Sequence, residues 1–191
     1  MKKSKDAENR AIMAVADMMM AAARTAPKGC GLDNLETMLL TSTDKERLTA
    51  EMRKIAVETG ADFFDRDAGN IDACPVIMLL GAINNPTGLT GCSLCGFPTC
   101  QDTVEAGANC AFNVTDLGIA IGSAVSIAAD NRIDSRVMFS AGKAAIRLGL
   151  FENNVRVGYG IPLSTSSKSI FFDRGMPSGA LAKAAEPDER K

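Results

Sequence analysis

The chain has 191 residues, of which 46% are apolar, and this is enough for one domain with a hydrophobic core. Its 21 basic and 23 acidic residues leave a net charge of −2, so no basic excess favours nucleic acid or an anionic membrane as a partner. Histidine is absent, which excludes Ser–His and Cys–His catalysis and every metal site built on imidazole. Metal ligands would have to come from cysteine, aspartate or glutamate.

The N-terminal stretch has the basic and apolar composition of a signal peptide but not its charge pattern. Asp6 and Glu8 separate the basic end from the apolar run, and Asp17 interrupts that run, whereas secretory signals exclude such charges. The run is also shorter than the roughly 20 residues that a membrane span needs. We therefore expect a cytoplasmic protein with no membrane partner, whose six cysteines are thiols or metal ligands rather than disulfides.

Two helices are predicted in the N-terminal part. Residues 8–24 are apolar on most faces, which predicts a largely buried helix. Thr43 and Glu46 have the spacing of a capping box, so a second helix is expected from about residue 44 to a stop at Gly60.

Strands and helices alternate along the rest of the chain. Residues 74–80 form a continuous apolar run bounded by Pro and Gly, typical of a central strand. The other segments are strands at 35–42 and 154–164 and helices at about 112–129 and 140–149. This alternation predicts an α/β or α+β fold. We expect a single domain over residues 1–177, with an iron–sulfur segment at 91–110, and a polar tail at 178–191.

The chemistry of the chain is concentrated in four cysteines with the spacing C-x2-C-x4-C-x9-C: Cys92, Cys95, Cys100 and Cys110. Four thiolates from one short, glycine-rich segment are what an iron–sulfur cluster requires, because glycine lets the backbone fold tightly and turn its amides toward the sulfurs. A short helix expected to begin at Thr99–Cys100 would direct its first N–H groups at the anionic cluster. The segment therefore predicts one 4Fe–4S cluster.

Two other chemistries fit part of the same pattern. A structural zinc site usually shows two C-x2-C pairs, and only one is present here. A redox dithiol would use Cys92 and Cys95 and leave the other two cysteines of the segment without a role. Cys74 opens an apolar strand and is expected to be a small buried residue, although it is also an alternative to Cys110 as the fourth ligand.

The stretch "GCSLCGFPTCQDTVEAGANCAFNVTDLGIAIGSAVSIAAD" resembles a family of uncharacterised proteins described as containing a ferredoxin domain. The similarity covers nearly the whole chain and implies that the four cysteines of this segment are cluster ligands. The C-G-F-x-T-C core is also similar, only locally, to the 4Fe–4S motif of corrinoid iron–sulfur proteins.

Two further stretches are similar to the flavin-dependent nitroreductase fold: "AAARTAPKGCGLDNLETMLLT" to its opening segment and "VRVGYGIPLSTSSKSIFFDR" to its closing one. This resemblance implies a central sheet flanked by helices, an inserted cysteine-rich loop and a homodimer. Lys168 and Arg174 match the basic residues that help to hold the FMN phosphate in those enzymes. However, Gly31 and Asp33 stand where the flavin enzymes commonly have Asn and Gln. The fold therefore carries over more safely than the cofactor.

The leading hypothesis is a cytoplasmic 4Fe–4S electron-transfer protein that exchanges single electrons with a partner protein or a flavin. An FMN-dependent reductase of the nitroreductase type, fed by the cluster, is the first alternative, and it would make the protein an oxidoreductase. A zinc-stabilised interaction module is the second. In a homodimer, the first helix and the helix at 112–129 are the expected contact surfaces.

Overall fold

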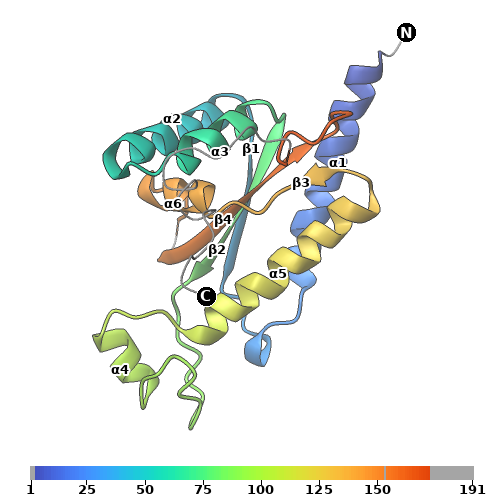
Figure 1. Ribbon diagram of the computed structural model, residues 1–191. Coiled ribbons are helices and arrows are strands. Elements are labelled where there is room, and N and C mark those ends of the chain that lie inside the picture. The colour runs from blue at the N-terminus through green and yellow to red at the C-terminus, as the bar shows by residue number, and fades with distance from the viewer. Residues whose placement is uncertain (1–2, 153, 173–191) are drawn as a thin grey trace, which may run out of the picture.

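The computed structural model describes residues 3–152 and 154–172 as one antiparallel sheet covered by helices on both faces (Figure 1). The four strands are β1 (Leu35–Leu40), β2 (Val76–Ile83), β3 (Asp134–Ser135) and β4 (Val155–Ser164). Their order in the sheet is β1-β2-β4-β3, and every paired neighbour is antiparallel. β2 lies between two long partners and is buried along all but its last residue, so the prediction of a central strand here is confirmed.

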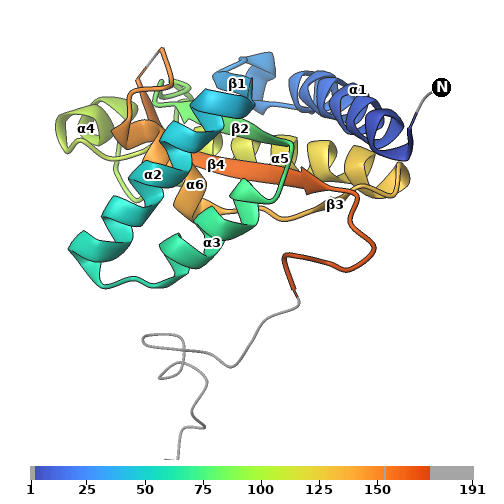
Figure 2. The ribbon, with the colours of Figure 1, turned by 90° about the horizontal axis from the view of Figure 1, so that it is seen from above.

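The helices form one layer on each face of the sheet (Figure 2). One layer consists of α1 (Ser4–Thr25) and α5 (Ala111–Asp130), and the other of α2 (Ser42–Thr59), α3 (Phe63–Asp72) and α6 (Phe139–Arg147). Alternate residues of β2 point into the two layers: Met78 and Leu80 pack with α1 and α5, whereas Ile77 and Leu79 pack with the other three helices. The result is a three-layer α+β fold, as expected.

Two predicted details of the N-terminal helices are wrong. α1 buries only one face, and Met18 on the other face is 45% exposed, so the helix is not largely buried. α2 begins at Ser42 after Thr41, with no side-chain cap hydrogen bond, so the predicted capping box at Thr43 does not form. The predicted stop is confirmed, because Gly60 adopts the left-handed conformation with φ of 69°.

Three elements were not predicted: the single-turn helix η1 (Gly29–Gly31), the helix α3 and the two-residue strand β3. The buried side chains of α3 include Phe64, Ala68 and Ile71, which follow the i, i+4, i+7 spacing of a helix. Asp and Gly residues between them obscure this pattern. β3 owes its conformation to pairing with Ser164 and Leu163 at the edge of the sheet, which no local pattern indicates.

α5 is the one helix among the described residues that is long and apolar enough to cross a membrane by length and composition. This is a weak indication, since the core helix of a soluble protein passes the same test. Here α5 packs along α1 and the sheet through Leu117, Ala120, Ala124 and Ala128. Ser123 joins the two helices by donating a hydrogen bond to the carbonyl of Ala22 at 2.9 Å.

The cysteines lie in a segment at one end of the sheet, residues 84–110, which we call the cysteine segment. It leaves β2, contains the short helix α4 (Cys100–Glu105), and returns to start α5 (Figure 1). The chain after β4, residues 165–172, lies at the opposite end of the sheet, next to the start of β2. The predicted tail at 178–191 and the predicted domain boundary at 177 lie outside the described residues.

Candidate metal centre

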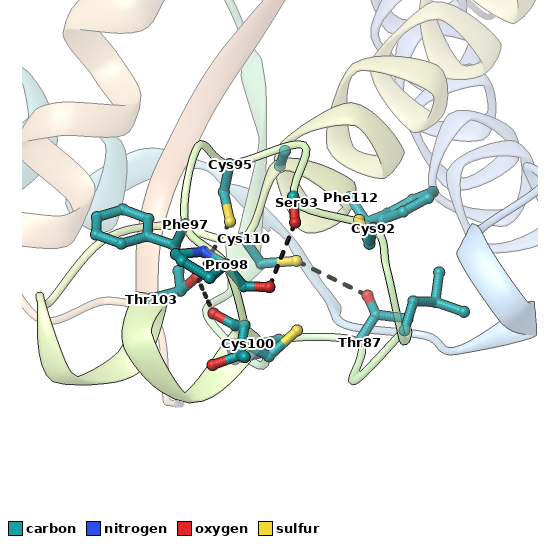
Figure 3. Close-up of a pocket in the computed structure, with 14 residues that line it drawn as sticks. Thr87, Cys92, Ser93, Cys95, Phe97, Pro98, Cys100, Thr103, Cys110 and Phe112 are labelled. Atoms are coloured by element: carbon teal, nitrogen blue, oxygen red, sulfur yellow. Dashed lines mark hydrogen bonds between the residues drawn. The ribbon is translucent and has the colours of Figure 1, made fainter.

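The structure brings the four predicted ligands to one cavity. Cys92, Cys95, Cys100 and Cys110 all line one small cavity, partly open to solvent, between the cysteine segment and the first turn of α5. Figure 3 shows their side chains around this space, with Thr87, Thr103 and Phe112 among them. Cys110 is buried and the other three are half-buried. Residues far apart in the segment therefore share one site.

Left-handed backbone conformations fold the segment back on itself around the first two cysteines. Gly91 and Gly96 have φ of 73° and 84°, and Ser93 between them has φ of 44°. The N–H of Gly96 donates to the carbonyl of Ser93 at 3.0 Å and closes a tight turn that contains Cys95. Glycine adopts such angles without steric cost, which explains why these residues adjoin the cysteines.

α4 begins where the sequence predicted. Thr99 is its N-cap and forms a capping box with Asp102, in which each side chain bonds the other's backbone N–H. Cys100 is therefore the first residue of the helix, and Thr103, one turn later, is also turned toward the cavity.

The two ends of the cysteine segment are fastened together by Asn84. Its side-chain oxygen accepts from the N–H of Cys110 at 3.2 Å, and its side-chain nitrogen donates to the carbonyl of Ala108 at 3.2 Å. Arg156 of β4 adds a hydrogen bond to the carbonyl of Gly107 at 2.7 Å. These contacts fix the start of α5, and with it Cys110, relative to the end of β2.

The surroundings of two sulfurs favour the thiolate. The hydroxyl of Thr103 lies 3.0 Å from the sulfur of Cys95, and together with the N–H of Phe97 it lowers the pKa of that thiol. Burial acts to raise the pKa of Cys110. The backbone N–H groups of Asn113 and Thr87, with the Thr87 hydroxyl 3.8 Å away, outweigh burial and lower this pKa as well. Hydrogen-bond donors around thiolates suit an anionic iron–sulfur cluster, so the donor set fits the predicted group.

The cysteines of the site are not grouped closely enough to hold a single metal ion. Among the residues that the structure describes, no three Cys, Asp or Glu side chains lie close enough together to hold one metal ion. A structural zinc ion would need four sulfurs at about 2.3 Å from one centre. In a 4Fe–4S cluster each thiolate binds a different iron, so the sulfurs surround a larger volume.

Cys74 is separated from this site by the length of a strand. It precedes β2, whereas the cysteine segment follows it, and the 8 residues of β2 at about 3.3 Å each span about 26 Å. Its sulfur lies 3.2 Å from the carbonyl of Asn70, and burial raises its pKa to about 12. Cys74 is thus a core residue, and Cys110 is the fourth cysteine of the cavity.

The loop between α1 and β1 contacts the site through Phe112. This loop contains the short helix η1 (Gly29–Gly31), and the N–H of Gly29 donates to both carboxylate oxygens of Asp116 at 2.9 and 3.1 Å. A Cβ atom on Gly29 would lie 2.9 Å from the Phe112 ring, which also lines the cavity. The loop and α5 are therefore in close contact beside the cysteines.

Of the two residues predicted for the flavin phosphate, the structure describes only Lys168. Lys168 is exposed in the segment after β4, at the end of the sheet opposite the cysteines, and Arg174 lies outside the described residues. Asp33 forms an ion pair with Arg24, and Lys28 lies 3.9 Å from its carboxylate. The negative charge that would disfavour a reduced flavin near Asp33 is thus compensated.

The comparison with known proteins identifies the family. Over 178 residues the chain is 39% identical to an uncharacterized protein of Archaeoglobus fulgidus, covering 89% of this chain and 95% of that protein. The family model described as "Uncharacterized protein containing a ferredoxin domain (DUF2148)" matches residues 106–174. The chain belongs to this family. The matched region includes Cys110 but begins after the other three cysteines, so the resemblance to this family is confirmed while the complete ligand set stays a prediction.

Solved structures show the fold. The FMN-dependent nitroreductase NfnB from Mycobacterium smegmatis, in complex with NADPH, is 14% identical with a TM-score of 0.56, covering 91% of this chain and 87% of that one. A BluB-like flavoprotein from Clostridium difficile is 19% identical with a TM-score of 0.52, covering 90% and 86%. At these identities the likeness concerns the fold alone, and the predicted nitroreductase-like fold is confirmed.

Proposed function

We propose that this member of the ferredoxin-domain family is an electron-transfer protein with one 4Fe–4S cluster held by Cys92, Cys95, Cys100 and Cys110. The observation that carries the proposal is that these four thiols line one cavity of a glycine-turned segment. When bound, the cluster supplies reversible one-electron reduction. No side chain has to act as a general base, which suits a chain without histidine.

The surrounding residues would hold the cluster and tune it. The hydroxyls of Thr103 and Thr87 lie 3.0 and 3.8 Å from the sulfurs of Cys95 and Cys110, and with nearby backbone N–H groups they stabilise negative charge on these sulfurs. Such hydrogen bonds raise the reduction potential of iron–sulfur centres, because the reduced state carries the greater negative charge. Asn84 keeps Cys110 at the cavity by binding its backbone N–H.

Elemental analysis of protein purified without oxygen tests this function. We expect about four irons and four acid-labile sulfides per chain, as a 4Fe–4S cluster requires, and an electron paramagnetic resonance signal after reduction. Absence of iron and sulfide would refute the proposal. Zinc near one per chain, with no visible absorbance, would instead support the zinc-stabilised module.

An FMN-dependent reductase fed by the cluster is the second candidate. Two observations favour it: the nitroreductase-like fold, and the compensation of Asp33 by Arg24 in the loop beside Phe112. Because Lys168 lies at the end of the sheet opposite Asp33, Lys168 and Arg174 would contact the phosphate of this FMN from the other subunit of a homodimer. Acid release of a yellow, fluorescent cofactor from anaerobic protein would support this candidate, and substitution of both basic residues by Gln should then lower the flavin content. A colourless extract counts against it.

We also propose a cytoplasmic homodimer. α1 and α5 lie side by side on one face of the sheet, and both leave apolar side chains outward, with Met18 45% and Ile119 42% exposed. Exposed apolar helix faces of this kind favour association. Light scattering during gel filtration should give twice the chain mass, and Ile119→Glu should reduce it to one chain. A monomeric wild-type protein would contradict the dimer.

A further inference from the structure

The outer surface of the cysteine segment differs from the rest of the molecule. Residues 84–101 contain no charged side chain, and the only charged residues up to Cys110 are Asp102 and Glu105 on α4. Apolar side chains here are left in solvent: Leu94 is 66% exposed, Val104 52% and Leu89 39%. Neither hydrophobic core includes a residue of this segment. The surface is therefore apolar with an acidic flank.

The same surface adjoins the cavity. Leu94 lies between Cys92 and Cys95, and Leu89 lines the cavity together with the cysteines. Figure 1 shows the segment projecting from the end of the sheet, away from both helical layers. A macromolecule that exchanges electrons with a centre in this cavity can approach it here, because the segment that lines the cavity projects from the body of the molecule.

The negative charge of the site and of its surroundings determines which kind of partner is attracted to it. An iron–sulfur cluster with four thiolates is anionic, and Asp102 and Glu105 add to its charge. The segment contains no basic residue of its own, and Arg156, which reaches its base, donates to the carbonyl of Gly107. A partner with an acidic rim would be repelled, and one with a basic rim attracted.

We propose that the exposed face of residues 84–105 is the docking surface for electron exchange, and that its partner is a redox protein whose cofactor edge is apolar and ringed by lysine or arginine. This inference rests on the proposed function. In the transfer, the reduced cluster loses one electron and the oxidised cofactor of the partner gains it, and no covalent bond changes. Leu94 would supply the apolar contact, and Glu105 would supply charge attraction at the rim.

Mitochondrial ferricytochrome c, whose haem edge is surrounded by lysines, is a suitable probe. The reduced holoprotein is mixed with it under anaerobic conditions, and the second-order rate of haem reduction is measured. We expect Leu94→Ser to lower this rate about tenfold, since one buried leucine contact is lost. Glu105→Gln should lower it about threefold at low salt, with the difference vanishing at high salt. Val57→Ser on α2, where Val57 is 87% exposed, is the matched control and should leave the rate unchanged.

Two further measurements distinguish a loss of docking from damage to the cluster site. The Leu94→Ser protein should keep its iron content and paramagnetic spectrum, and its reaction with a small uncharged quinone should be unchanged. Equal rates for Leu94→Ser and Val57→Ser with cytochrome c would overturn the inference. So would an equally fast reaction with an acidic-rimmed copper protein. Failure of the proposed function is a separate result, because it shows as absent iron and sulfide before any mixing.

Discussion

Serine substitutions at Cys110 and Cys74 distinguish the proposed cluster ligand from a core thiol, because the two residues are similarly buried but lie at opposite ends of β2. Cys110 is 6% and Cys74 is 2% exposed. At Cys74, serine puts a hydroxyl into the apolar core, with the carbonyl of Asn70 as its acceptor. We expect a loss of about 1–2 kcal/mol in the free energy of unfolding, since partial hydrogen bonding offsets part of the burial.

The opposite sign is expected at Cys110 in metal-free protein. Cys110 is the N-cap residue of α5, and its sulfur, although near the N–H of Asn113, forms no capping hydrogen bond of ordinary geometry. Serine is among the preferred N-cap residues and stabilises a helix by about 0.5–2 kcal/mol relative to a residue that cannot cap. Metal-free Cys110→Ser should therefore unfold at the same or a higher urea concentration than the metal-free parent, although it loses its cluster.

The assay combines iron and sulfide analysis after anaerobic reconstitution with urea unfolding of the metal-free proteins. Cys110→Ser should fall well below the parent in iron while keeping its stability. Cys74→Ser should retain iron and lose stability. The reverse result, with iron lost at Cys74 and kept at Cys110, would refute both the strand-length argument and the assignment of the fourth ligand.

Three further predictions concern thiol reactivity and packing. In folded, metal-free protein at neutral pH, iodoacetamide should label exposed Cys30 but not Cys74, whose pKa is raised to about 12 by burial; mass spectrometry would show any contrary label. Gly142→Ala places a Cβ atom 1.8 Å from a carbonyl oxygen of β4 and should cost about 3 kcal/mol or more in urea unfolding, whereas Gly69→Ala on α3 meets nothing within 4 Å and should not destabilise. The ammonium of buried Lys45 donates to three carbonyls at and just after the end of α3, so Lys45→Met should cost at least about 1 kcal/mol in urea unfolding, and a smaller loss would contradict a stabilising role for these hydrogen bonds.

Local sequence patterns predicted those parts of the fold that depend on a few neighbouring residues. The continuous apolar run of β2 and the left-handed stop at Gly60 are of this kind. The sequence overestimates the burial of α1, because alanine and methionine tolerate both a core and a solvent-facing position, and only packing against α5 and the sheet decides which side is covered. The sequence does not predict α3, because acidic residues interrupt its apolar spacing.

The sequence could predict which cysteines come together at the candidate site but not the residues that support them. Cysteine spacing is a local property, whereas Thr87 and Asn84 reach Cys110 only because the segment folds back onto the end of β2. The sequence does contain a signal that places Thr103 at the site. It stands three residues after Cys100 on a helix that the sequence does predict, and positions three apart share a helix face.

The separation of the cysteine segment from both cores has a consequence for how the protein responds to cluster loss. The hydrogen bonds described here hold the segment at its ends, through Asn84 and Arg156, and no residue from 84 to 110 belongs to either hydrophobic cluster. Free energy released by binding a cluster would therefore order this segment and add little to the sheet and its helices. The three-layer body would stay folded after oxidation of the cluster, in contrast to small metal domains that unfold without their metal. Intact folding of an aerobic preparation is thus no argument that its cluster is present, and the iron and sulfide content has to be measured in protein that has not met oxygen.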